Sequence, residues 1–175
     1  MPKYKKKITR TMSYEELIEG IQEAEERIFH FPTAHKALLV LLFFAGCRIS
    51  EALAITDEDI YASGDTLFIQ IKRLKGSKQT DPIELPNQGV LQWLGEQEGK
   101  IFDFSRFTAY RVVKKVFPDL YPHYFRMNRI TKVDSQFGDA TVYRLFGITA
   151  TSIDHYRGKV ELKEVAKEMK KEIRS

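Results

Sequence analysis

An arginine that follows directly on a long apolar run is the first residue of chemical interest in this chain. The run occupies positions 37–45 and leads through Gly46 and Cys47 into Arg48. A guanidinium so close to a core is costly to leave unpaired, because burial removes its water. Two partners could satisfy it: the carboxylate of Glu51, or the phosphate of a bound ligand. The sequence leaves both alternatives open.

A second candidate for chemistry is the His-x-x-Arg motif formed by His123 and Arg126. It follows Pro122, a residue that favours the first turn of a helix. Residues three apart lie on one face of a helix, so both side chains can point into the same site. Histidine exchanges protons near neutral pH, and arginine can bind two oxygens of a phosphate. A surface or core-capping position is the alternative for His123.

A short mid-chain segment concentrates positive charge between two predicted strands. It contains Lys72, Arg73, Lys75 and Lys78, and residues 74–79 are expected to form the tip of a hairpin. Crowded cations lower the pKa of a lysine, which is otherwise about 10.4, and a lowered pKa suits a general acid. The alternative is a solvated basic turn that touches phosphate groups without specificity.

Taken in order, the arginine box, the hairpin lysine, His-x-x-Arg and the late Tyr156 resemble the pattern of the tyrosine recombinases, the phage-integrase family. Residues 46–53, Gly-Cys-Arg-Ile-Ser-Glu-Ala-Leu, are similar to that family's first-arginine box. Residues 75–78, Lys-Gly-Ser-Lys, resemble its hairpin motif. The resemblance covers about residues 12–160, and the last third is most similar to the divergent archaeal viral integrases.

The resemblance implies a site-specific DNA recombinase that cuts and rejoins strands through a 3′-phosphotyrosine intermediate, without metal, ATP or another cofactor. Tyr156 would be the nucleophile, Lys75 the acid for the leaving 5′-oxygen, and His123 the group that relays a proton. Arg48 and Arg126 would stabilise negative charge in the transition state. Contacts to DNA are expected from Lys72, Arg73, Lys78 and Arg129.

Departures from the family pattern leave a second interpretation open. Met127 stands where a histidine usually follows the arginine, and Ile148 stands where a histidine or tryptophan usually follows Gly147. The spacing from Gly147 to Tyr156 is also one residue shorter than usual. The chain could therefore be a catalytically weakened DNA-binding relative with a regulatory or architectural role. A metal-dependent nuclease is disfavoured, because no acidic cluster beside a histidine is evident.

Periodicity predicts an α+β fold, mostly helical with a small antiparallel hairpin or sheet, and the resemblance identifies this as the tyrosine-recombinase catalytic-domain fold. Ser13 opens a capping box for a first helix that reaches about residue 28. Thr33 is expected to cap the apolar helix that ends at Gly46. The other expected elements are strands at 66–72 and 81–86 and helices at 49–55, 88–97, 106–116, 122–136 and 139–146.

Three segments are expected along the chain. Residues 1–11 indicate a basic linker or flexible lead, 12–159 the catalytic domain, and 160–175 an amphipathic C-terminal helix. Family members often pass this last segment to a neighbouring protomer, so exchange within a dimer or tetramer on DNA is expected. A helix folded back on its own domain is the alternative. The family's N-terminal DNA-clamping domain is not evident, which indicates either a catalytic fragment or a minimal single-domain form.

Composition narrows the remaining function classes. A chain of 175 residues suits one domain, and a net charge of +4 fits an anionic partner such as double-stranded DNA without requiring one. The single cysteine, Cys47, rules out an internal disulfide. No apolar run is long enough to span a bilayer, and no signal peptide follows the basic N-terminus. We therefore expect a cytoplasmic, DNA-associated protein without a membrane partner, and the resemblance is compatible with a viral or plasmid origin.

Overall fold

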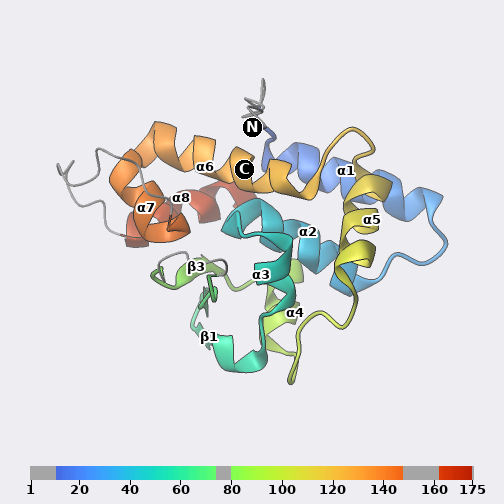
Figure 1. Ribbon diagram of the computed structural model, residues 1–175, viewed down its shortest axis with the longest axis horizontal. Coiled ribbons are helices and arrows are strands. Elements are labelled where there is room, and N and C mark those ends of the chain that lie inside the picture. Colours follow the sequence, from blue (N-terminus) through green and yellow to red (C-terminus); the bar gives the residue numbers. More distant parts are fainter. Residues whose placement is uncertain (1–10, 74–79, 148–161, 175) are drawn as a thin grey trace, which may run out of the picture.

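The computed structural model describes residues 11–73, 80–147 and 162–174 (Figure 1). This part of the chain is mostly helical and contains one three-stranded antiparallel sheet, which confirms the predicted fold class. None of the helices described is long and apolar enough to cross a membrane.

Helix α2 (Thr33–Ala45) lies at the centre of the core. Its residues from Ala37 to Ala45 are all buried, because the run is apolar on every side of the helix. The helix ends as predicted at Gly46, whose φ of 58° lies in the left-handed region that glycine adopts easily. Its start differs from the prediction: Pro32 is the N-cap residue and Thr33 already belongs to the helix, so no side chain caps it.

The other long helices pack around α2 (Figure 1). Helix α1 (Tyr14–Arg27) begins with the predicted capping box of Ser13 and Glu16. Helix α6 crosses α2, and it has α1 and α5 near one end and α7 near the other. Their bounds are α5 (Arg106–Val116), α6 (Pro122–Phe137) and α7 (Asp139–Phe146), close to those predicted.

The sheet has the strand order β1–β2–β3, and the strands are β1 (Ile60–Ser63), β2 (Thr66–Ile69) and β3 (Ile83–Pro86). Strand β1 was not predicted, although Ile60 and Tyr61 are strand-forming residues just ahead of the turn. The core side of the sheet is apolar and buried, with Leu67, Ile69, Ile83 and Leu85. The sheet therefore packs one face on the helices and leaves the other toward solvent.

Short elements complete the described chain. Helix α3 (Ile49–Leu53) follows α2 after a three-residue link and begins where predicted. The 3-10 turns are η1 (Asp57–Asp59) and η2 (Gly89–Leu91). In place of the single helix expected at 88–97, η2 is followed by one turn of helix, α4 (Gln92–Gly95).

Helix α8 (Leu162–Arg174) packs against strand β3 of its own chain. Met169 is buried there, and the Lys170 ammonium lies 3.0 Å from the Asp65 carboxylate. Within this single chain the helix thus folds back on its own domain, which is the alternative stated above. Exchange between protomers stays a prediction.

Candidate active site

Arg48 occupies the N-cap position of α3, directly after the left-handed turn that ends α2. Its guanidinium Nη1 donates to Glu51 Oε1 at 2.8 Å, and its backbone N–H donates to Glu51 Oε2 at 2.8 Å. The Arg48 side chain remains 32% exposed, whereas that of Glu51 is fully buried. Glu51 is therefore the partner that Arg48 has in this structure, and the exposed part of the guanidinium can still reach an anion from solvent.

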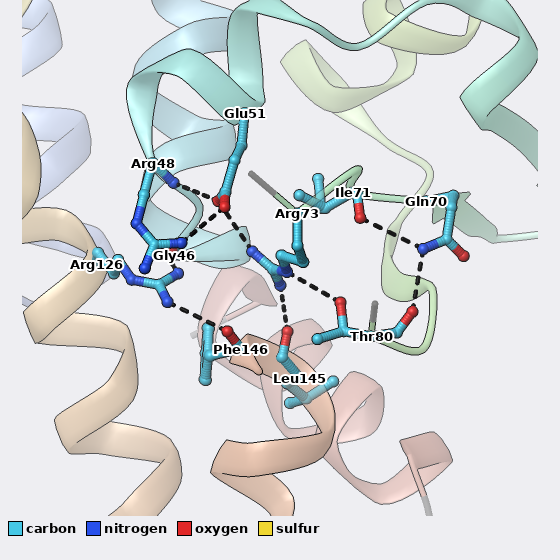
Figure 2. Close-up of polar contacts among 10 residues, drawn as sticks. All are labelled: Gly46, Arg48, Glu51, Gln70, Ile71, Arg73, Thr80, Arg126, Leu145 and Phe146. Carbon is cyan, nitrogen blue, oxygen red and sulfur yellow. Dashed lines mark hydrogen bonds and ion pairs between the residues drawn. The ribbon is translucent and has the colours of Figure 1, made fainter. Parts of the chain in front are cut away.

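The Glu51 carboxylate is the centre of a buried charge network (Figure 2). Burial alone would raise the pKa of this carboxyl. The Arg48 backbone amide and the Arg73 and Arg48 guanidiniums outweigh burial, and the pKa lies below its ordinary value. Glu51 therefore stays ionised and orients both arginines.

Arg73 is the second arginine on Glu51, and its position corrects a prediction. Its side chain is fully buried, and its Nη1 lies 3.0 Å from Glu51 Oε2. Its Nε donates to Thr80 Oγ1 at 3.0 Å, and its Nη2 donates to the Leu145 carbonyl. A guanidinium held inside the domain cannot contact a DNA backbone, so the prediction that Arg73 binds DNA is wrong for this arrangement.

Arg126 lies on α6 with its guanidinium beside the end of α2 (Figure 2). Its Nη1 donates to the Gly46 carbonyl at 2.9 Å, and its Nη2 donates to the Phe146 carbonyl at 3.2 Å. Burial, then the positive charges of Arg48 and Arg73, lower the pKa of Arg126 to about 10. Among the described residues no carboxylate forms an ion pair with it, so Arg126 is a charged group with donors to spare.

His123 lies one turn before Arg126, at the start of α6, and its side chain is exposed. Partial burial lowers its pKa below the ordinary value of 6.5, and the charges of Arg126 and Arg48 lower it further. The imidazole is therefore neutral at neutral pH and can accept a proton. The influence of both arginines also means that three of the predicted residues lie within electrostatic reach of one another.

Arg48, His123 and Arg126 thus converge from the start of α3 and the start of α6. Two guanidiniums beside a neutral imidazole can bind a phosphate and move a proton next to it. The mutual repulsion of the arginines, which lowers the pKa of Arg126, would be relieved by an anion between them. The site is therefore electrostatically suited to a phosphate group.

Arg129, three residues after Arg126, is also buried, and this corrects a second prediction. Its Nε donates to the Phe43 carbonyl at 2.9 Å, and its Nη1 lies 3.5 Å from Glu172 of α8. Its guanidinium lies over the rings of Phe43 and Phe44. Arg129 holds the core and α8 together, so the prediction that it contacts DNA is wrong for this arrangement.

The remaining predicted residues divide into two groups. Lys72 is on the surface, with its side chain 57% exposed and its ammonium 3.2 Å from Asp59, so it is available to an anionic partner. Lys75, Lys78 and Tyr156 lie outside the described residues, as does Ile148. Their predicted roles stay predictions.

One exposed surface was not predicted from the sequence. The exposed side of α5 and the turn after it carry Phe107, Tyr110 and Tyr121, which are 68%, 41% and 49% exposed. The Arg111 guanidinium lies 5.7 Å from the centre of the Phe107 ring, and the Lys114 ammonium lies 4.2 Å from that of Tyr121. We call these five residues the α5 face. Phe107, Tyr110, Arg111 and Lys114 follow the i, i+3, i+4, i+7 pattern of one helix face, so helical periodicity could have revealed most of it.

Cys47 is buried. Burial raises the pKa of its thiol to about 12, although Arg73 and Arg126 act in the opposite direction. It is therefore an uncharged, packed side chain rather than a reactive thiolate. Within the described ranges no three histidine, cysteine or acidic residues are grouped so that they could hold a metal ion.

Comparisons with known proteins find no significant similarity in sequence but a clear similarity in fold. No protein-family model matches the sequence, and no curated protein is significantly similar to it in sequence. XerH site-specific recombinase, in a pre-cleavage complex with difH substrate, has a TM-score of 0.62 and 22% identity over 89% of this chain and 52% of its own. XerA recombinase has a TM-score of 0.59 and 19% identity, over 95% of this chain and 65% of its own.

A lambda integrase, as a tetramer bound to a Holliday junction, has a TM-score of 0.50 and 16% identity over 87% of this chain and 50% of its own. The chain therefore spans between about half and two thirds of the length of these structures. Their likeness to it shows the fold of the tyrosine-recombinase catalytic domain, which confirms the fold predicted from the resemblance.

Proposed function

We propose that this chain is the catalytic domain of a site-specific DNA recombinase that cleaves and rejoins DNA strands through a 3′-phosphotyrosine intermediate. The observation that carries the proposal is the convergence of Arg48, His123 and Arg126 in one electrostatically coupled site. Arg48 belongs to the start of α3 and His123 and Arg126 to α6, and a purely structural role would not require the three to lie within electrostatic reach of one another. The likeness in fold to recombinases that act on DNA adds to this support.

The proposed reaction uses each residue in a distinct role. The Tyr156 oxygen attacks the scissile phosphorus, and the bond from phosphorus to the 5′-oxygen breaks. Neutral His123 accepts the tyrosine proton, and Lys75 gives a proton to the leaving 5′-oxygen. Arg48 and Arg126 bind the non-bridging oxygens, which gain charge in the transition state. Religation is the reverse sequence, since the phosphotyrosine keeps the energy of the broken bond.

The proposed partner is double-stranded DNA on either side of the scissile phosphate. The α5 face adjoins the site, because Tyr121 is only two residues before His123. Arg111 is exposed and Lys114 is partly exposed, so their charges suit the phosphate backbone, and a helix of this kind fits the major groove. Lys72 adds a further exposed cation. Affinity for duplex DNA should therefore fall steeply as salt rises, and a dissociation constant insensitive to salt would contradict this interface.

We further propose that the protein self-associates on DNA as a dimer or tetramer, as the tetramer of the lambda integrase neighbour suggests. Residues 160–175 would then be the segment exchanged between protomers. Removing them should reduce assembly on DNA while leaving the domain folded, as measured by light scattering and circular dichroism. An unchanged DNA assembly would favour a helix that stays on its own domain.

The decisive experiment is the capture of a covalent adduct. The protein is incubated with a library of nicked duplexes that carry random sequence around the nick, and the DNA that survives denaturation on the protein is recovered and sequenced. This procedure finds the preferred site and detects the adduct together, and mass spectrometry then locates the modified tyrosine. We expect it at Tyr156.

Tyr156→Phe should form no adduct and should bind the recovered DNA with a dissociation constant within about fivefold of the wild-type value, since one hydroxyl contributes only about 1 kcal/mol. Tyr143→Phe is the matched control, because Tyr143 lies on α7 close in sequence. An adduct in Tyr156→Phe but none in Tyr143→Phe would assign the nucleophile to Tyr143. Lys75→Ala should cleave slowly, and a substrate with sulfur at the 5′-bridging position should restore its rate.

A second function, that of a catalytically inactive DNA-binding relative, is supported by Met127, which stands where the family usually has a histidine, and by Ile148, which cannot donate a hydrogen bond to phosphate as the usual histidine or tryptophan can. In the same library experiment this protein would retain specific DNA before denaturation and none afterwards. Sequence-specific retention without any adduct in the wild type would establish this alternative.

A further inference from the structure

Arg73 joins three parts of the chain that are far apart in sequence (Figure 2). Its guanidinium contacts Thr80 on the other arm of the hairpin, Glu51 on α3, and the carbonyl of Leu145 at the end of α7. Its side chain is fully buried. Because arginine presents a rigid planar fork of donors, one side chain can fix the relative positions of all three partners.

The first of these contacts holds the base of the hairpin. Backbone pairing of β2 with β3 ends at Ile69 and Ile83. Beyond that point side chains connect the two arms: Gln70 Nε2 donates to the Thr80 carbonyl at 3.0 Å, and Arg73 Nε donates to Thr80 Oγ1 at 3.0 Å. Arg73 and Thr80 flank residues 74–79, the segment that contains Lys75.

The second contact acts on Arg48 through Glu51. The carboxylate divides its oxygens, since Oε1 accepts from Arg48 Nη1 and Oε2 accepts from Arg73 Nη1. Without Arg73, one oxygen of a fully buried carboxylate would lose its charged partner. Oε2 would keep only the Arg48 backbone N–H, so the carboxylate could shift toward Arg48, and the direction of the Arg48 guanidinium would change with it.

The third contact lies at the C-terminal end of α7. Arg73 donates to the Leu145 carbonyl, and Arg126 donates to the next carbonyl, that of Phe146. The last carbonyls of a helix lack partners within the helix and carry partial negative charge, so cations stabilise them. Two arginines therefore hold the point at which the chain leaves α7 toward Tyr156.

We propose that Arg73 is a positioning residue for strand cleavage: it directs Arg48 through Glu51 and fixes the base of the segment bearing Lys75 against the end of α7. This role rests on the proposed function. Arg73 does not touch the DNA, so its removal changes the geometry of the reacting groups and leaves the DNA-binding surface intact. A misplacement of about 1 Å can slow an enzyme on the order of 100-fold.

The test is single-turnover adduct formation on the nicked duplex recovered from the library. For Arg73→Gln we expect the cleavage rate constant to fall about 100-fold. The dissociation constant for DNA should stay within about threefold of the wild-type value, and the final fraction of protein in adduct should be unchanged. Loss of affinity as large as the loss of rate would overturn the proposal, because it would place Arg73 in DNA binding.

The final fraction of protein in adduct distinguishes a positioning role of Arg73 from a role in folding. If Arg73 merely stabilised the fold, fewer molecules would react and each would react at the wild-type rate, which would also overturn the proposal. Arg73→Lys serves where Arg73→Gln fails to fold, since an ammonium keeps the charge pair with Glu51 but cannot span all three partners. We expect the cleavage rate constant of Arg73→Lys to be about tenfold below the wild-type value. An unchanged rate constant would contradict the proposal.

Arg144→Gln is the matched control. Arg144 is an exposed arginine of α7 that pairs with Asp81 at 3.1 Å, so it also connects α7 with the hairpin but lies at the surface. Its rate constant should stay within about twofold of wild type, since exposed pairs contribute little. An equal loss in both variants would mean that the connection of α7 to the hairpin matters without any special part for Arg73.

If the wild type forms no adduct and the proposed function fails, hydrogen exchange still tests whether Arg73 joins its three partner segments. In Arg73→Gln the amides near Thr80, Glu51 and Leu145 should exchange faster, whereas those of α1 and α5 should not change. Unchanged exchange at the three sites would show that Arg73 does not join them, and a uniform rise would show a general loss of stability. Either result would overturn the proposal independently of catalysis.

Discussion

Two buried arginines on the same helix lie one turn apart and serve opposite purposes. Arg126 and Arg129 of α6 each donate to a carbonyl near the end of α2, those of Gly46 and Phe43, and both hydrogen bonds are 2.9 Å long. Their second partners differ. Arg129 pairs with the Glu172 carboxylate, whereas Arg126 donates to a second neutral carbonyl, and within the described chain no carboxylate forms an ion pair with it, although Glu51 is near enough to affect its pKa.

The difference shows how one packing motif can support either a core or a site. Arg129 has its charge compensated and lies over two aromatic rings, as a structural arginine does. Arg126 has no ion-pair partner among the described residues. Burial, then the charges of Arg48 and Arg73, lower its pKa against the opposing effect of Glu51, and Arg48 and Arg126 are suited to a shared anion. An uncompensated buried cation is costly, and this cost is what a bound phosphate would relieve.

The largest expected effect comes from replacing Arg126, the arginine that has no ion-pair partner among the described residues. Arg126→Lys should lower the rate of adduct formation by roughly 10²–10³-fold, because an ammonium cannot replace the two-pronged hold on a phosphate. Arg129→Lys makes the same change at the structural arginine and should leave the rate of adduct formation per active molecule within about threefold of the wild-type value. Equal losses of rate in the two variants would remove the distinction between them.

The next effect concerns Gly46, whose backbone packs closely against Arg129 of α6 and Phe146 of α7. A Cβ at this position would lie 2.8 Å from the Phe146 ring and 2.9 Å from the Arg129 Cβ, and φ is 58°. Gly46→Ala should therefore lower the free energy of unfolding by roughly 2–4 kcal/mol, measured with denaturant. Gly64→Ala is the control, since its φ of 60° is similar but nothing lies within 4 Å. It should lose only about 1 kcal/mol, and equal losses would refute the close packing at Gly46.

A smaller change would make Arg129 resemble Arg126. Glu172→Gln removes the carboxylate that compensates Arg129, and we expect the free energy of unfolding to fall by about 2 kcal/mol. This is less than for a fully buried pair, because the Glu172 side chain is 25% exposed. Lys167→Gln, at an exposed position of α8, should change stability by less than about 0.5 kcal/mol. No difference between the two would mean that the pair does not hold α8.

The smallest effect is a dependence on pH that distinguishes His123 from His35. Burial and nearby positive charges lower the pKa of both, so the unfolded chain binds more protons as the pH falls through 6.5. The free energy of unfolding should therefore decrease there, and either His→Gln variant should reduce the decrease. Only His123→Gln should also remove the loss of cleavage rate on acidification, because His35 lies at the far end of α2. The same rate profile in both variants would argue against His123 as the proton acceptor.

Much of the fold could be predicted because its signals are local. The capping box of Ser13, the apolar run that ends at Gly46 and the period of α5 and α6 each depend on neighbours in sequence. Strand β1 was missed because it is short and mostly exposed, so it has little hydrophobic pattern. A strand of this kind forms because β2 offers it a partner.

The candidate site could be predicted only in part. Arg48, His123 and Arg126 were identified by residue type and order, and the structure brings them together. Arg73 and Arg129 were assigned to DNA because a basic segment and a basic helix usually face solvent. Sequence cannot reveal that Glu51 and Glu172 turn them inward, because those contacts join elements distant along the chain.

The sequence by itself determined where most of the long helices begin and end, which helix fills the core, and which residue types could bind a phosphate. These properties depend on periodicity and on the chemistry of single side chains. Only the tertiary structure decided which arginines are compensated, since charge compensation depends on which carboxylate lies within a few ångströms. Arg126 and Arg129 are the same residue on the same helix, and they differ because Glu172 of α8 reaches one and not the other.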